Sequence, residues 1–260
     1  MVADVSEDAL LQLKNVSVGF GGLKALSNVS VSGRAGEVVA VIGPNGAGKT
    51  SLFNAITGFV PIQSGQILFK GKRIDGLLAH EIAAHGVRRT FQNGGLAPTL
   101  TVLENVLCGL HRQIPAHPLS IALGLPAARR AERAALEKAR DLLDRLGIRR
   151  LEHELAANLS GGQQRMVEIL RSIAAEAPLL LLDEPAVGLA PPVRAELGKI
   201  ISDLAHARGV GILLIEHAIE LVMQVSDRIA VLNYGEKIAE GSPEQIRSNQ
   251  MVLEAYLGHG

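Results

Sequence analysis

The sequence predicts an α/β fold built around a mostly parallel sheet. Three continuous apolar runs of strand length occur at "EVVAVIG", "PLLLLDEP" and "GVGILLIEH"; the first ends in glycine and the other two end in polar residues. Strands without apolar–polar alternation are typical of a parallel sheet that is covered on both faces. A helical pattern, "KTSLFNAITGF", follows the first run after a short glycine-rich stretch. The 260 residues, 47% of them hydrophobic, are enough for one such domain with a full core.

The N-terminal part adds a predicted antiparallel β subdomain. "LLQLKNVSVGF" alternates in part, which indicates a half-exposed strand. "VSVSGRAGEVVAVIG" predicts a pair of strands joined at Gly33 to Gly36. "SGQILFKGKRI" predicts a hairpin that returns to the antiparallel sheet.

The middle of the chain, from about Thr90 to Asn158, is predicted to be mainly helical. Pro115, Pro118 and Pro126 indicate a loop or an irregular insertion. "AARRAERAALEKARDLLDRLG" predicts an amphipathic helix that ends at Gly147. Its expected buried face is Leu136, Ala139, Leu142, Leu143 and Leu146. We expect this helical lobe to pack on the core, and a partner-binding helix is the alternative.

The C-terminal part is predicted to form a hairpin and a last helix. "RIAVLNYGEKIAEG" has turn residues at Tyr234 and Gly235. In "GSPEQIRSN", Ser242 is a helix cap, Pro243 takes the first position and Gln245 closes a capping box. The whole chain is expected to be one domain. Its parts are a core with antiparallel strands (about 10–90 and 158–241), a helical subdomain (about 91–157) and a C-terminal helix (242–260).

The amino-acid composition disfavours several classes of protein. Lys and Arg number 26, as do Asp and Glu, so the formal net charge is zero and a general nucleic-acid binder is disfavoured. The single cysteine, Cys108, cannot form an internal disulfide. The start "MVADVSEDAL" lacks the apolar segment of a signal peptide, and no uncharged apolar run reaches about 18 residues. We expect a soluble, cytosolic protein that reaches a membrane only through a partner.

"GPNGAGKT", from Gly43 to Thr50, predicts a phosphate-binding loop. It fits the pattern G-x-x-x-x-G-K-[ST] and lies between a predicted buried strand and a helix, which is the context that the pattern requires. Its glycines let backbone N–H groups surround phosphate oxygens. Lys49 supplies a positive charge for the β and γ phosphates, and the Thr50 hydroxyl can ligate Mg²⁺.

Other polar residues are expected at the carboxyl ends of neighbouring strands, where ligands bind in open α/β sheets. Asp183 can bind Mg²⁺ directly or through water, and Glu184 can accept the proton of an attacking water. His217 ends another strand and can contact a γ-phosphate if the two strands are adjacent. Gln92, in "RTFQN", can reach Mg²⁺ or the water. Phe20 is a candidate for stacking on adenine, with core packing as the alternative.

"NLSGGQQRMVEIL" predicts a second anion site at a helix start. Ser160 is the expected cap, and two glycines and Gln163 follow it. The first backbone N–H groups of a helix lack partners within the helix, so they can bind an anion. One small protein therefore has two phosphate-binding segments far apart in its sequence.

These motifs together resemble the ATP-binding subunits of ATP-binding cassette (ABC) transporters over nearly the whole chain. Their order matches the family. It runs from the aromatic Phe20 through the Walker A loop Gly43, Pro44, Asn45, Gly46, Ala47, Gly48, Lys49 and Thr50 with Ser51, the Q-loop Gln92, the signature Leu159, Ser160, Gly161, Gly162 and Gln163, and Walker B Asp183 with Glu184, to the switch His217. The resemblance implies a P-loop (RecA-like) core, an antiparallel β subdomain and an α-helical signature subdomain, with ATP and Mg²⁺ as cofactors.

The resemblance also implies partners. Such subunits work as head-to-tail pairs, homo- or heterodimeric, in which the signature of one subunit covers the γ-phosphate held by the other. Transmembrane permease subunits and a solute-binding protein would complete a transporter, with this chain on the cytoplasmic face of the membrane. Ala190 departs from the family pattern, which often has an acidic or amide residue in this D-loop, so the contact with the partner that is usual there is expected to be weaker.

Within the family, "RTFQN", the proline-rich insertion and the ending "VLEAYLG" resemble the ATPases of branched-chain amino acid importers. Subunits for urea or short-amide uptake and for lipopolysaccharide export are similar alternatives. Two other classes are a soluble ABC protein acting on ribosomes or nucleic acid and a P-loop kinase or GTPase. The absence of a net positive charge disfavours the former, and the latter leaves the signature without a role.

Overall fold

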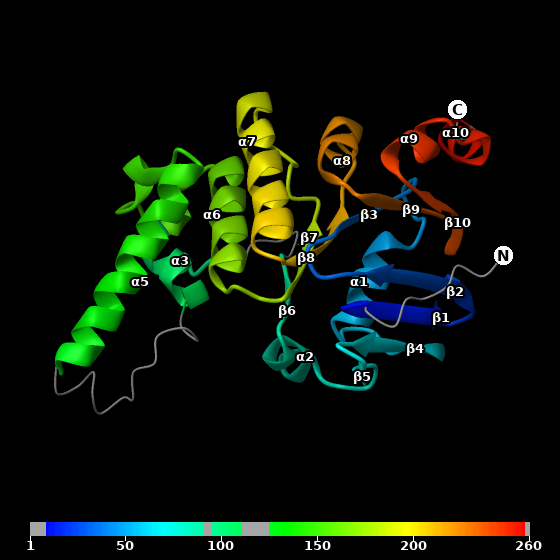
Figure 1. The fold of residues 1–260 in the computed structure, drawn as a ribbon, viewed down its shortest axis with the longest axis horizontal. Helices are drawn as coiled ribbons and strands as arrows, with labels where there is room; N and C mark the ends of the chain where they lie inside the picture. Colours follow the sequence, from blue (N-terminus) through cyan, green and yellow to red (C-terminus); the bar gives the residue numbers. More distant parts are fainter. Residues whose placement is uncertain (1–8, 91–94, 111–124, 258–260) are drawn as a thin grey trace. The chain divides into compact units, whose positions relative to one another are not determined.

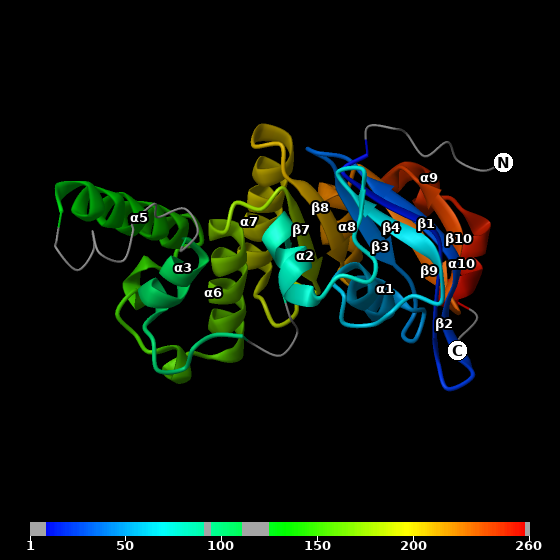
Figure 2. The same ribbon diagram turned by 90° about the horizontal axis from the view of Figure 1, so that it is seen from below.

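The computed structural model describes residues 9–90, 95–110 and 125–257. The chain forms two compact units. The sheet unit comprises residues 1–89, 178–186 and 198–260, and the helical unit comprises residues 90–177 and 187–197. Figures 1 and 2 show the elements of each unit. Within the described ranges, no helix is long and apolar enough to span a membrane.

A six-stranded sheet forms the centre of the sheet unit. Its strand order is β10 (Glu236–Gly241), β9 (Arg228–Asn233), β3 (Val38–Ile42), β8 (Gly211–Ile215), β7 (Leu179–Asp183) and β6 (Val87–Arg89). All neighbours are parallel except β9 and β10, which form the predicted hairpin. The three predicted buried strands are β3, β7 and β8, and every residue in them is buried. The predicted mostly parallel sheet is thus confirmed.

A second sheet is antiparallel throughout, as predicted. Its order is β2 (Leu23–Gly33), β1 (Leu11–Phe20), β4 (Ser64–Phe69) and β5 (Lys72–Arg73). The predicted pairing across Gly33 to Gly36 is wrong, because β2 belongs to this sheet and β3 to the other. The physical reason is that β3 is buried on both faces and has parallel partners, β8 and β9, on both of its edges.

Helix α1 (Lys49–Ile56) packs between the two sheets in Figure 1. Leu52, Phe53 and Ile56 are buried in one hydrophobic cluster with residues of both sheets. Members from the antiparallel sheet include Leu13 and Ile67, and members from the parallel sheet include Val41, Leu181 and Leu213. The loop that precedes α1 is therefore fixed at the carboxyl end of the central strand β3.

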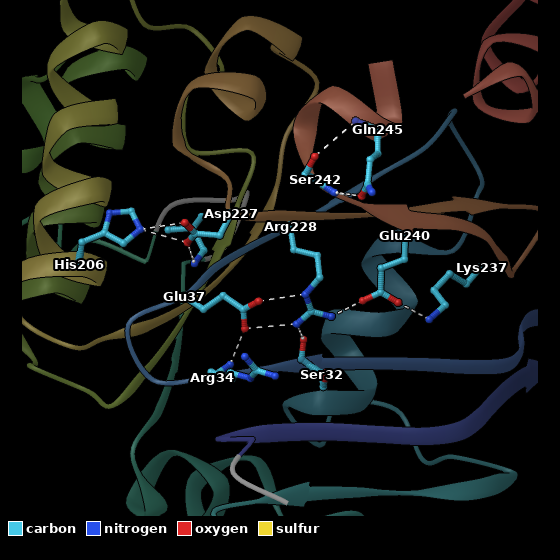
Figure 3. Close-up of polar contacts among 11 residues, drawn as sticks. Ser32, Arg34, Glu37, His206, Asp227, Arg228, Lys237, Glu240, Ser242 and Gln245 are labelled. Atoms are coloured by element: carbon cyan, nitrogen blue, oxygen red, sulfur yellow. Dashed lines mark hydrogen bonds and ion pairs between the residues drawn. The ribbon is translucent and has the colours of Figure 1, made fainter. Parts of the chain in front are cut away.

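Polar contacts at the amino end of β3 and β9 join the two sheets (Figure 3). Arg228 donates to Glu37 Oε1 at 2.9 Å and to the backbone oxygen of Ser32 at 2.6 Å, and it also pairs with Glu240. Burial alone lowers the pKa of Arg228, but hydrogen bonds and charges of Glu37 and Glu240 outweigh this effect and raise it. The guanidinium of Arg228, in β9, therefore links β2 of one sheet to Glu37, just before β3, and to β10 of the other.

The remaining helices of the sheet unit include α2 (Ala79–His85), α8 (Ile219–Val225), α9 (Pro243–Arg247) and α10 (Gln250–Leu257). The predicted cap of α9 is confirmed, since Ser242 N–H donates to Gln245 Oε1 at 2.8 Å (Figure 3). The prediction of a single C-terminal helix is wrong. Asn249 interrupts the helix and its carbonyl accepts the N–H groups of Val252 and Leu253, so a second helix begins.

The helical unit contains α3 (Val102–Leu110), α5 (Pro126–Arg145), α6 (Gly161–Ala174) and the start of α7 (Pro191–Ser202). In Figure 2, α3 lies between α5 and α6. A Cβ on Gly109 of α3 would lie 2.2 Å from the carbonyl oxygen of Arg171 in α6, so glycine permits their close approach.

Two details of α5 correct the sequence analysis. Pro126 occupies the first turn of the helix, where its missing N–H costs nothing, instead of belonging to the insertion. Ala135 is buried in place of Leu136, which is half-buried. The predicted stop at Gly147 is confirmed, with φ of +66°. Pro115 and Pro118 lie outside the described residues.

Candidate active site

The loop Gly43–Thr50 joins β3 to α1 and has the backbone shape of a phosphate cradle. Gly43, Gly46 and Gly48 all have positive φ, at +153°, +79° and +102°. At Gly43 the close approach also requires glycine, because a Cβ would lie 2.1 Å from the carbonyl oxygen of Leu232. Such a loop directs successive backbone N–H groups at one anion.

The turn between β9 and β10 supports this loop. Gly235 N–H donates to the Ala47 carbonyl at 3.1 Å, and Ser27 N–H donates to the Gly235 carbonyl at 2.8 Å. Tyr234 and Gly235 both have positive φ, as a two-residue hairpin turn requires. The phosphate-binding loop, the β2 strand and the hairpin are therefore hydrogen-bonded to one another.

Lys49 is buried and points back into the loop. Its Nζ donates to the carbonyl oxygens of Gly43 and Pro44 at 2.7 and 2.9 Å. Burial lowers the pKa of Lys49, and the negative charges of Glu184 and Asp183 offset this lowering only in part. An anion in the loop would stabilise the charged ammonium group, so Lys49 is suited to binding a phosphate group.

Asp183, at the end of β7, forms a buried ion pair that the sequence analysis did not predict. Arg89 Nη2 lies 2.8 Å from Asp183 Oδ2, and the two side chains are 6% and 1% exposed. Arg89 also donates to Asn54 Oδ1 of α1 at 2.7 Å. Nothing in the spacing of "VRRTFQN" distinguishes Arg89 from Arg88, so only the pairing of β6 with β7 shows its role.

Glu184 and His217 meet at the carboxyl edge of the parallel sheet. Strands β7 and β8 are adjacent, as the sequence-based hypothesis for His217 required, with Asp183 opposite Ile215. Glu184 Oε1 lies 3.1 Å from His217 Nε2. Glu184 has a φ of +49°, which is unusual for a residue other than glycine, and its N–H donates to the Ile215 carbonyl at 2.8 Å. Strained backbone of this kind is enriched at functional sites.

A cavity of about 530 Å³ adjoins these groups. It is lined by residues of the phosphate-binding loop and by Phe20, Glu184, His217 and Tyr234. Phe20 is 48% exposed, which excludes core packing. Tyr234 is 74% exposed and was missed as a site residue, because the sequence shows it only as a turn residue. Small-molecule pockets span about 300–1,000 Å³, so the cavity has room for a nucleotide.

The signature segment lies in the helical unit and begins α6 as predicted. Ser160 is the N-cap: its N–H donates to Gln163 Oε1 at 2.8 Å, and its Oγ accepts from Gln163 N–H at 3.4 Å. Gly162 is close-packed, since a Cβ there would lie 3.1 Å from the Gly188 carbonyl oxygen. Ser160 and Gly161 are exposed, so the helix start is open to solvent.

Gln92 lies outside the described residues. Cys108 is exposed on α3, and the described part of the chain holds no cluster of three or more His, Cys, Asp or Glu side chains suited to a metal ion. The parallel sheet, the glycine-rich loop and the acidic residues at the strand ends define a P-loop nucleotide-binding protein.

Comparisons with known proteins give the family. Residues 26–187 match the family model "ABC transporter", and residues 236–260 match the model "Branched-chain amino acid ATP-binding cassette transporter". The chain is 44% identical over 249 residues to the high-affinity branched-chain amino acid transport ATP-binding protein LivG of Salmonella typhimurium, covering 96% of this chain and 98% of that protein.

Solved structures of ABC transporter cassettes are similar to this chain. The ADP conformation of an ATP-binding cassette of an ABC transporter is 34% identical, with a TM-score of 0.79, and the match covers 96% of this chain and 99% of that chain. A dimeric cassette in a post-hydrolysis state bound to ADP and Pi is 25% identical, with a TM-score of 0.78 and coverage of 90% and 98%. The chain belongs to the ABC transporter family and is one of its ATP-binding, ATP-hydrolysing subunits.

Proposed function

We propose that this subunit powers the import of branched-chain amino acids. The observation that carries the proposal is the match of residues 236–260 to a model specific to branched-chain amino acid cassettes. The 44% identity to LivG, which extends over nearly the whole chain, supports it.

Nucleotide binding is assigned to the cavity beside the phosphate-binding loop. Phe20 stacks on adenine, and the backbone from Gly43 to Thr50, together with Ser51, holds the phosphates. The exposure of Phe20 on the cavity wall and the positive φ angles of the loop support these roles. Lys49 balances phosphate charge from its buried position.

Mg²⁺ fits the oxygen donors at this site. Thr50 offers a hydroxyl group on the cavity wall, and Asp183 offers a carboxylate at the end of β7. Hydroxyl and carboxylate oxygens are ligands that Mg²⁺ prefers. We assign Thr50, Asp183 and Gln92 to the metal, which when bound neutralises negative charge on the phosphates.

Hydrolysis is assigned to Glu184 and His217. Glu184 accepts a proton from the attacking water, and His217 contacts the γ-phosphate. The 3.1 Å contact between their side chains supports this pairing, because a histidine that touches Glu184 is placed to orient its carboxylate.

A second cassette completes the site in this proposal. Ser160, Gly161, Gly162 and Gln163 contact the γ-phosphate bound by the partner cassette. The exposed, capped start of α6 supports the role, since a helix N-terminus favours an anion. The similar dimeric cassette gives a precedent for pairing. Ala190, in the D-loop, is expected to weaken one contact across the pair.

The remaining partners follow from the proposed import. Permease subunits in the membrane would bind this subunit on the cytoplasmic face, and a solute-binding protein on the other side would deliver the amino acid. No role with nucleic acid is proposed, because the formal net charge is zero.

The test is isolation of partners from solubilised membranes of the native host with Glu184→Gln protein, ATP and Mg²⁺. The amide cannot accept the proton, so hydrolysis stops while the ATP-bound pair persists. We expect polytopic subunits and a solute-binding protein specific for leucine, isoleucine or valine. Glu236→Gln, an exposed glutamate of β10, is the matched control and should retain hydrolysis. Recovery of soluble partners alone would refute the proposal.

A further inference from the structure

Glu216 lies between β8 and His217, and its side chain turns into the protein. It is 2% exposed. Its Oε2 accepts the backbone N–H groups of His217 and Ala218, at 2.8 and 2.9 Å. Its Oε1 accepts the N–H of Ala186 at 2.6 Å. One buried carboxylate thus binds three backbone donors from two segments of the sheet unit.

These contacts connect the two residues assigned to hydrolysis. Ala186 follows Glu184 by two residues, and His217 is the next residue after Glu216. The Glu184 N–H is held by Ile215 of β8. The backbone around Glu184 is therefore fixed to β8 at two points, and one of them is the Glu216 carboxylate.

The free energy of burying the Glu216 carboxylate favours a single position of its side chain, with all three hydrogen bonds formed. A buried carboxylate is very unfavourable without hydrogen bonds, and bonds to an ionised acceptor are stronger than neutral ones. Glu216 can leave its position only if all three bonds are lost. The left-handed backbone of Glu184 also needs surrounding structure to persist, because it is otherwise unfavourable.

We propose that Glu216 is a positioning residue for ATP hydrolysis. Its carboxylate sets the separation between Glu184 and His217 by holding the segment after β7 against the turn after β8. The inference depends on the proposed roles of Glu184 and His217. It assigns Glu216 no contact with the nucleotide.

Glu216→Gln tests this assignment. Glutamine keeps one oxygen acceptor but replaces the other with an NH₂ group, which cannot accept the backbone donors. We expect kcat to fall about 10-fold or more, because displacement of catalytic groups by about 1 Å can cost about 100-fold in rate. The Kd for ATP should stay within about twofold, because the phosphate-binding loop is anchored separately, by the hydrogen bond from Gly235 N–H to the Ala47 carbonyl.

Asp227→Asn is the matched control. The Asp227 carboxylate also accepts a backbone N–H, that of Val38 at 2.8 Å, but at the amino end of β3 (Figure 3). In Asp227→Asn, the same change from carboxylate to amide should lower the unfolding midpoint of the protein and leave kcat within about twofold. Loss of kcat in Glu216→Gln alone supports positioning over general stabilisation.

Glu216→Asp covers the case in which the glutamine variant does not fold. It retains both oxygens and shortens the side chain, so we expect a smaller drop in kcat at unchanged Kd. The proposal is overturned if the folded variants keep the parent kcat, or if kcat and Kd deteriorate together, as a general loss of stability would cause. A parent protein without ATPase activity would instead contradict the proposed function, so the two failures are distinguishable.

Discussion

Replacing Arg89 with methionine isolates the contribution of the buried ion pair to stability. Methionine keeps much of the length of the side chain but removes the positive charge that faces Asp183 at 2.8 Å. Both side chains are almost completely buried, so the Asp183 carboxylate would remain in the interior without this counter-ion. Removing one partner of a buried pair typically costs about 3–5 kcal/mol. The hydrogen bond to Asn54 is lost as well, so the upper half of this range is expected.

The assay is urea unfolding of the full chain at neutral pH, with and without Mg²⁺ and ATP. In their absence, Arg89→Met should lower the free energy of unfolding by about 4 kcal/mol. With both present, part of the loss should be recovered, since a cation bound near Asp183 replaces the missing charge. The double variant R89M/D183N should also be more stable than R89M, because no uncompensated carboxylate remains.

Arg145→Met is the control. Arg145 pairs with Asp141 at 3.0 Å, and both side chains are exposed to solvent, at 40% and 62%. Exposed pairs contribute about 0–1 kcal/mol, so this change should be nearly neutral. A loss below about 1 kcal/mol in Arg89→Met would refute the reasoning, because the buried pair would then behave like a surface pair.

Three further predictions concern the nucleotide cavity. Gly43→Ala places a Cβ 2.1 Å from the Leu232 carbonyl oxygen, so binding of a fluorescent ATP analogue should be abolished; binding at the parent affinity would contradict the assignment of the loop. Tyr234→Ala should weaken ATP binding several-fold but leave tripolyphosphate binding unchanged, since Tyr234 and Phe20 line the same cavity. Equal losses for both ligands, measured by calorimetry, would indicate a change in the loop instead. The pKa of Lys49 is lowered by burial, so between that pKa and the unfolded value of 10.5 the unfolded chain binds more protons, and stability should gain from this group as pH rises. Subtracting the unfolding free energies of Lys49→Met from those of the parent at several pH values isolates this gain, and a flat difference would contradict it.

Local patterns predicted the helix starts of the candidate site better than they predicted the pairing of strands. The loop Gly43–Thr50 and the cap at Ser160 depend on neighbours within a few residues, so motif and spacing were sufficient. The separation of β2 from β3 depends on β8 and β9, which lie far along the chain, so a local turn signal at Gly33 to Gly36 could not show it.

The missed residues have the same explanation. Arg89 and Glu216 are charged residues that become buried only because distant strands align beside them. Tyr234 occupies a turn that was predicted correctly, but the contact of that turn with Ala47 is not visible in either segment alone. Sequence reasoning thus singles out residues of recognisable chemistry and misses those that become buried or paired only through tertiary packing.

The position of β3 has a consequence for synthesis of the chain on the ribosome. This strand carries the phosphate-binding loop, yet its two neighbours, β8 and β9, begin only at residues 211 and 228. Long-range strand pairing is slow to form because the intervening chain must first be brought together. The central strand therefore emerges with both edges unpaired, and its loop gains the support of Gly235 only after residue 235 has been synthesised. A nascent chain of this protein cannot complete its nucleotide cradle early, and its exposed apolar strands are candidates for chaperone binding during that interval.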